Sequence, residues 1–307
     1  MSEHEENKPV ITPGIDSFKD LSSLASDFPE LVKSRLTALV LITTGAGFCL
    51  GWQSESSLWN LFHVLLGTAG VAAGAAVLNE LLEVGPDGKM KRTQERPLPA
   101  GRINPQDALF IGGILSGLGL AYLSMVVNSL SALLAGITWG IYLFIYTPMK
   151  RVSSWNTLVG AIPGALPPTI GWAAAAGSIN SEATLFFLLQ FCWQMPHFLA
   201  IAWLYREDYD RGGFRMITAT DAQGKKTALY SLIHTASILP LTVATFYYGE
   251  ASWIFLIGGL VFAVIYLLPA VRFWRAPDNT TAKPLFLTSL LYLPGLFMVA
   301  ILDRAIF

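Results

Sequence analysis

The sequence predicts an all-α protein that crosses a lipid bilayer nine times, with a cytoplasmic N-terminus and a C-terminus outside. Of its 307 residues, 53% are hydrophobic and only 13% are charged, too few charges for a surface that faces water. The apolar residues gather in nine stretches, each near the roughly 20 residues that a helix needs to cross a bilayer. Basic residues also alternate between successive loops, as the positive-inside rule requires.

The first thirty residues are polar and acidic, and we expect them to form a cytoplasmic tail over 1–30. They match neither a cleavable signal peptide nor an Arg-rich, acid-poor mitochondrial presequence. We therefore expect one intramembrane domain over 31–307 in a bacterial cytoplasmic membrane. The two cysteines, Cys49 and Cys192, both fall in apolar stretches and are interpreted as small hydrophobic residues.

Nine apolar stretches follow the tail, with boundaries that carry an uncertainty of about 2–4 residues. They are 36–52, 58–82, 107–127, 130–148, 157–176, 183–204, 228–248, 252–273 and 284–302. The fifth stretch contains Pro163, Pro167 and Pro168, so we expect a broken helix that lines a cavity.

The basic residues test this count independently. Loops after the even-numbered stretches hold fifteen Lys and Arg residues, whereas loops after the odd-numbered stretches hold none. Because Lys and Arg near span ends collect on the cytoplasmic side, the alternation places the N-terminus inside. An incorrect count would have disturbed this pattern.

Two of the predicted inner loops, 83–106 and 205–227, are much richer in charge than the others. They are four spans apart, which suggests two similar halves with a site at their interface. The loops on the outer side are very short. We therefore expect any chemistry at the inner face.

The first charged loop begins with oxygen-bearing side chains spaced four residues apart. On a continuous helix, Asn79, Glu83 and Asp87 would lie on one face. An amide and two carboxylates are ligands that suit Mg²⁺. Pro86 follows Gly85, so we expect the helix to break or kink there and Asp87 to lie on the loop. The alternative interpretation is an ordinary solvated helix end.

The second loop, "WLYREDYDRGGFRM", repeats this pattern with Glu207 and Asp208. Two acidic clusters with arginines behind them would hold a metal-bound diphosphate, because guanidinium groups bind phosphate oxygens in bidentate fashion. Arg92, Arg96 and Arg102 are candidates for that task. A diphosphate at the end of an apolar bundle implies a lipid-like tail inside it, and an isoprenoid diphosphate has this shape.

Three segments carry a resemblance to a known family: "NELLEVGPDGKMKRTQERPLPAGR", "YTPMKRVSSWNTLVGAIPGALPPTIGW" and "WQMPHFLAIAWLYREDYDRGGFRM". The chain resembles the intramembrane prenyltransferases of the UbiA superfamily, most closely the members that modify heme. The resemblance implies Mg²⁺-assisted farnesyl transfer from farnesyl diphosphate to a vinyl group of heme B, with addition of water, to make heme O. It also implies heme A synthase or terminal oxidase assembly proteins as partners, and no nucleic acid.

The resemblance assigns roles residue by residue. It matches Asn79, Glu83 and Asp87 to the first family motif, Arg92 and Arg96 to the diphosphate-binding arginines, and Asp208 and Tyr209 to the second motif. Lys150 and Arg151 of the "MKR" segment are added as catalytic candidates, Glu207 as a metal ligand, and Tyr146 and Arg102 as substrate-binding candidates. The chain departs from the family in three places, one of which is Gly85, where many heme-modifying members have a further Asp. Glu83 replaces an Asp, and "EDYD" lacks the DxxxD spacing.

His197 lies within the sixth span beside Pro196. Ionisable residues inside a membrane are candidates for function, and an imidazole could ligate heme iron or position the acceptor. The competing interpretation is a histidine that forms a hydrogen bond between helices.

Two other functions compete with heme prenylation. One is prenylation of an aromatic quinone precursor by the same chemistry. The other is a membrane transporter or lipid-binding protein, because inverted halves and broken helices also suit transporters. Transporter sites lie near the bilayer midplane, whereas the carboxylates here gather at one face.

Overall fold

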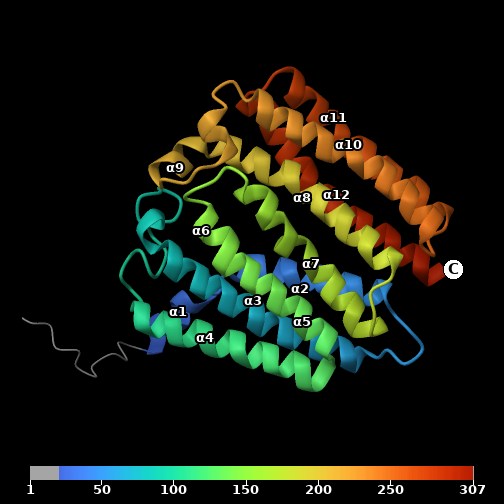
Figure 1. Ribbon diagram of the computed structural model, residues 1–307, viewed down its shortest axis with the longest axis horizontal. Coiled ribbons are helices and arrows are strands. Elements are labelled where there is room, and N and C mark those ends of the chain that lie inside the picture. Colours follow the sequence, from blue (N-terminus) through green and yellow to red (C-terminus); the bar gives the residue numbers. More distant parts are fainter. Residues whose placement is uncertain (1–20, 307) are drawn as a thin grey trace, which may run out of the picture.

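The computed structural model describes residues 21–306, which form helices and connecting loops without any β-strand (Figure 1). Eight of these helical segments are long and apolar enough to cross a membrane, and the 17-residue apolar helix Ser34–Leu50 is shorter. The elements are α1 (Leu21–Leu31), α2 (Ser34–Leu50), α3 (Leu58–Asp87), α4 (Pro105–Tyr122), η1 (Leu123–Val127), α5 (Ser129–Gly140), η2 (Ile141–Tyr146), α6 (Thr147–Met149), α7 (Asn156–Ala176), α8 (Ser181–Leu204), α9 (Arg206–Arg211), η3 (Ile217–Thr220), α10 (Lys225–Tyr248), α11 (Trp253–Arg275) and α12 (Asn279–Ile306).

Each predicted apolar stretch coincides with one helical rod, so the all-α membrane fold is confirmed. Two rods contain wide π-helical turns, where η1 extends α4 and η2 joins α5 to α6. The number of crossings and the orientation of the termini stay predictions. The end of the predicted tail forms helix α1, and its first twenty residues lie outside the described range.

The helices pack in two groups that meet along α2 and α7 (Figure 1). In one group α3 packs on α4 and α5 on α7, and in the other α8, α10, α11 and α12 pack together. Large apolar side chains fill the second group, including the fully buried Phe255, Tyr266 and Tyr292. The two groups form one bundle with distinct ends.

Helices α2 and α7 approach each other backbone to backbone. A Cβ atom on Gly47 would overlap the carbonyl group of Pro168, and a Cβ on Gly171 would overlap that of Thr44. Only glycine permits such an approach. The predicted break in the proline-rich α7 is wrong, because the helix runs from Asn156 to Ala176 without interruption; neighbouring helices allow proline inside buried helices.

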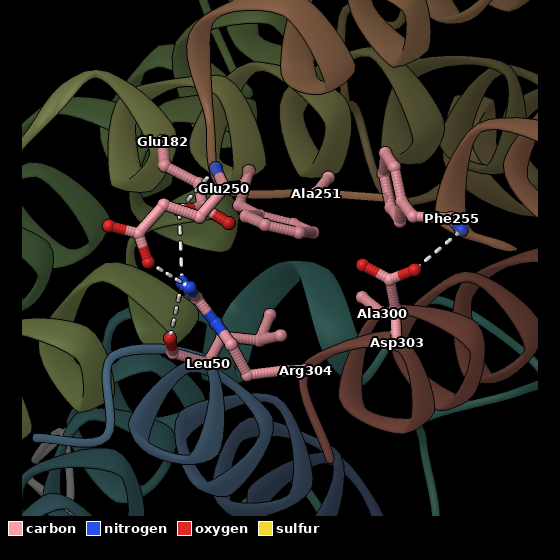
Figure 2. A pocket seen from close by; sticks show the side chains of 9 residues that line it. Leu50, Glu182, Glu250, Ala251, Phe255, Ala300, Asp303 and Arg304 are labelled. Carbon is pink, nitrogen blue, oxygen red and sulfur yellow. Dashed lines mark hydrogen bonds and ion pairs between the residues drawn. The ribbon is translucent and has the colours of Figure 1, made fainter. Parts of the chain in front are cut away.

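Charged loops cover one end of the bundle, and a compact polar network closes the other (Figure 2). Arg304 pairs with Glu182 (3.0 Å) and Glu250 and donates to the backbone oxygen of Leu50 at 3.1 Å. Asp303 accepts hydrogen bonds from the backbone N–H groups of Ser252 and Phe255. The cavity between these groups is about 10 Å³, too small for an organic ligand.

Candidate active site

The three oxygen-bearing side chains predicted on α3 lie together at its loop-covered end. Asn79, Glu83 and Asp87 are at most 4% exposed. The predicted position of Asp87 on the loop is wrong, because Asp87 is the last residue of α3. The helical hydrogen bonds continue past Pro86, because the Gly88 N–H donates to the backbone oxygen of Val84 at 3.1 Å. Asp87 therefore belongs to the helix and extends the same face.

Each of these side chains is paired with a cation from another part of the chain. The pairs are Lys33 Nζ with Asn79 Oδ1 (2.6 Å), Lys150 Nζ with Glu83 Oε1 (2.8 Å) and Arg96 Nη1 with Asp87 Oδ2 (2.7 Å). We call these six residues the α3 centre. They bring together the start of α2, the end of α3, the loop after α3 and the end of α6.

Burial and neighbouring charges set the protonation of the two lysines. Burial lowers the pKa of Lys33 to about 8, although the carboxylates of Glu83 and Asp87 oppose the shift. Burial also acts to lower the pKa of Lys150, but Tyr146 and Glu83 raise it above its usual value. The Lys150 ammonium lies 4.6 Å from the centroid of the Tyr146 ring, a distance that favours cation–π attraction.

The second charged loop meets the first through Asp208 of α9. This buried carboxylate accepts hydrogen bonds from the backbone N–H groups of Lys91 (3.1 Å) and Arg92 (3.3 Å) and pairs with Arg211. Burial alone would raise the pKa of Asp208, yet these hydrogen bonds lower it. The guanidinium of Arg92 lies 5.0 Å from the Tyr209 ring centroid. Both charged loops therefore share one end of the bundle, as the sequence predicts.

The α3 centre offers the ligand chemistry that Mg²⁺ requires. Asn79, Glu83 and Asp87 supply one amide and two carboxylate oxygens, which are hard ligands. Across the described residues 21–306, no group of three or more His, Cys, Asp and Glu side chains lies close enough to hold a metal ion. Asp208 binds the neighbouring loop, and Glu207 is exposed beside it. The residues thus fit a magnesium ion held chiefly by α3, together with substrate oxygens and water.

Three other predicted residues have identified partners. Tyr146 lies at the α3 centre beside Lys150. Arg102 instead binds α1, because its Nε lies 3.0 Å from both carboxylate oxygens of Asp27. Arg151 donates to the backbone oxygen of Leu82 at 3.0 Å from an exposed position. The structure therefore places Tyr146 at the centre and uses Arg102 and Arg151 to fasten neighbouring segments.

His197 bridges α8 and α12. Its Nδ1 lies 2.7 Å from Ser289 Oγ, and its ring packs against Trp193, Phe198 and Phe286. This is the interhelical hydrogen bond that the sequence left as the alternative. A contact between His197 and heme iron stays a prediction.

Three residues of this region escape sequence reasoning. Lys33 counts in the sequence only toward orientation, Thr147 looks like an ordinary span residue, and Glu80 is one of many charges. In the structure Asn79 Nδ2 donates to Thr147 Oγ1 at 3.0 Å. Glu80 is completely buried, and its Oε1 accepts a hydrogen bond from Leu98 N–H at 3.1 Å. A carboxylate inside an apolar run is the one signal that could have revealed Glu80.

Comparison with known proteins gives a consistent result. A family model described as the UbiA prenyltransferase family matches residues 40–298. A protoheme IX farnesyltransferase from Solibacter usitatus is 40% identical over 91% of this chain and 98% of its own. A solved structure concerning digeranylgeranylglyceryl phosphate synthase has a TM-score of 0.78 at 16% identity, covering 92% of this chain and 99% of that one.

A UbiA homolog from Archaeoglobus fulgidus, bound to GPP and Mg²⁺, has a TM-score of 0.67 at 17% identity and covers 89% of this chain and 99% of its own. At this identity the likeness shows the fold. The apolar helices and the family match make this an integral membrane protein. The chain belongs to the UbiA prenyltransferase family.

Proposed function

We propose that this enzyme transfers a farnesyl group from farnesyl diphosphate to a vinyl group of heme B, with addition of water, to make heme O. The names of its relatives support this acceptor. The observation that carries the proposal is the α3 centre, where three cations face three oxygen ligands at the end of an apolar bundle. We place the reaction in a bacterial cytoplasmic membrane, at its inner face.

The α3 centre suits the diphosphate end of the donor. Asn79, Glu83 and Asp87 would hold Mg²⁺, which supplies positive charge that stabilises the departing diphosphate. Lys33, Lys150 and Arg96 already point at these oxygens and can turn to phosphate oxygens when the donor enters. Cations that the protein already holds beside the departing group stabilise its developing negative charge.

The reaction breaks the bond between farnesyl C1 and the diphosphate oxygen, and the leaving group keeps the electron pair. The vinyl group then forms a carbon–carbon bond to C1, and water adds to the adjacent carbon and loses a proton. Tyr142 and Tyr146 are stacked with centroids 5.7 Å apart beside Lys150. Their faces can stabilise the allylic cation, while the apolar bundle keeps stray water away from it.

The test uses purified protein in detergent with heme B, farnesyl diphosphate and Mg²⁺, with and without a chelator. We expect a chelator-sensitive heme product that is heavier by one farnesyl group and one hydroxyl group. The Asp87→Asn variant should lose turnover, because it removes one carboxylate from the α3 centre. Glu250→Gln is the matched control, since it neutralises an exposed carboxylate at the opposite end.

Unchanged heme, together with prenylation of an aromatic acceptor, would contradict the heme assignment and favour the quinone precursor. The transporter alternative is disfavoured because the chain belongs to a prenyltransferase family and its polar centre lies at one end of the bundle. Heme A synthase or oxidase assembly proteins stay predicted partners.

A further inference from the structure

A second polar site lies where the loop after α3 meets α9 and the start of α12. Its cavity has a volume of about 480 Å³. The charged residues of its lining are Lys91, Arg92, Arg206, Arg211, Glu207 and Asp208. Four positive charges against two negative ones indicate an anionic ligand.

Two guanidinium groups of this cavity are held in place by the protein. Arg206 Nη1 donates to the backbone oxygen of Trp203 and to Asn279 Oδ1, both at 2.9 Å. The Arg92 guanidinium lies between two rings, 5.4 Å from the Tyr205 centroid and 5.0 Å from that of Tyr209. Groups that are already oriented lose little freedom when a ligand binds.

The carboxylates of the cavity do not cancel its positive charge. Asp208 already binds Arg211 and the backbone of the neighbouring loop. Glu207 can offset one further cation. Lys91, Arg92 and Arg206 carry three positive charges, and Glu207 offsets one of them. Two positive charges therefore remain for a ligand.

We propose that this cavity binds the two propionate carboxylates of the tetrapyrrole acceptor, an inference that rests on the proposed function. Heme B carries two such carboxylates, which match the excess charge. We assign the phosphates of the donor to Lys33, Lys150 and Arg96 of the α3 centre, which moves Arg92 from the diphosphate, where the sequence places it, to the acceptor. Leu204 and Tyr205 also line the cavity and give the apolar and aromatic surface that the edge of a macrocycle requires.

The position of the cavity suits a reaction between two substrates. The backbone N–H groups of Lys91 and Arg92 donate to Asp208, and Thr93 Oγ1 of the same loop donates to the backbone oxygen of Asp87 at 2.8 Å. One short loop therefore contacts both the cavity and the α3 centre. Carboxylates anchored in the cavity hold the acceptor next to the donor.

The test compares heme B with heme B dimethyl ester, in which both carboxylates are esterified. Binding of each to the detergent-solubilised protein is followed by absorbance titration, and KM is measured separately for each heme and for farnesyl diphosphate. The variants are Arg206→Gln and Lys91→Gln. The control is Arg275→Gln, an exposed arginine at the end of α11 that does not line the cavity.

Loss of a charge-assisted hydrogen bond costs about 1.5–3 kcal/mol, so each variant should raise Kd and KM for heme B about tenfold or more. KM for farnesyl diphosphate should stay unchanged, as should every constant of Arg275→Gln. The dimethyl ester should bind the wild type weakly and lose nothing further in the variants. Arg206→Gln removes contacts to Trp203 and Asn279 and can therefore disturb folding. Lys91 is an exposed loop residue, so Lys91→Gln tests the same proposal without this risk.

Two results would overturn the proposal. Equal binding of heme B and its ester would show that the carboxylates are not recognised. A raised KM for farnesyl diphosphate, with that for heme unchanged, would assign the cavity to the donor. In both cases wild-type protein still makes the heme product, whereas failure of the wild type to modify heme would refute the proposed function itself.

Discussion

Neutralising Glu83 should destabilise the protein and stop the reaction. The Glu83 and Lys150 side chains are only 5% and 15% exposed and lie 2.8 Å apart. At an effective dielectric constant of about 20, charges about 3 Å apart attract by about 5 kcal/mol. Removal of one partner from a buried pair costs about 3–5 kcal/mol, because the other charge stays buried. We expect a loss of this size in Glu83→Gln, which also leaves Lys150 beside Lys33 and Arg96 with one compensating carboxylate fewer.

The assay is reversible unfolding in detergent micelles together with turnover of heme B and farnesyl diphosphate. Glu83→Asp keeps the charge and should retain most of the stability and measurable turnover. Glu250→Gln removes an exposed carboxylate of an ion pair and should cost no more than about 1 kcal/mol. If Glu83→Gln unfolds within about 1 kcal/mol of the wild type, or turns over normally, the pairing does not hold the α3 centre together.

Three further predictions concern packing and anchoring. Gly47→Val should cost at least about 1–3 kcal/mol because the added atoms overlap α7, whereas Gly113→Ala, which meets open space, should unfold like the wild type in the same micelles. Glu80→Ala should lower turnover and cost about 1–3 kcal/mol because the Leu98 N–H loses its acceptor; Glu80→Gln keeps that oxygen, so equal turnover of the two variants would contradict an anchoring role. Asp303→Ala should cost a similar amount, measured by thermal unfolding, with both KM values unchanged; a changed KM would show that the distant end influences the site.

Hydropathy and charge alternation predict the helical rods well because both patterns are imposed by the bilayer itself. The five-residue continuation of α3 beyond its predicted end was missed, since Pro86 breaks helices in water. Near a helix end a proline costs little, because the bond from Gly88 to Val84 is still made. Pro163, Pro167 and Pro168 lie inside α7 instead, where the packing of neighbouring helices allows the helix to continue.

The site was predicted in part. Spacing on a helix places Asn79, Glu83 and Asp87 on one face, since their separation is a local property. The partner of each depends on tertiary contacts, so Lys33 could not be distinguished from any other basic residue near a span. Arg102 shows the converse, because an arginine beside a motif binds Asp27 of α1 instead.

The backbone contact between α2 and α7 has a mechanical consequence. Where Gly47 meets Pro168 and Gly171 meets Thr44, no side chain that could change rotamer lies between the two backbones, so the helices cannot slide or part there by small steps. Helices α2 and α7 therefore form a rigid pair in the middle of the molecule. If the bundle widens to admit a macrocycle, it therefore widens where segments meet through long side chains. The charged loops beside Arg92 and Arg206 are such a contact.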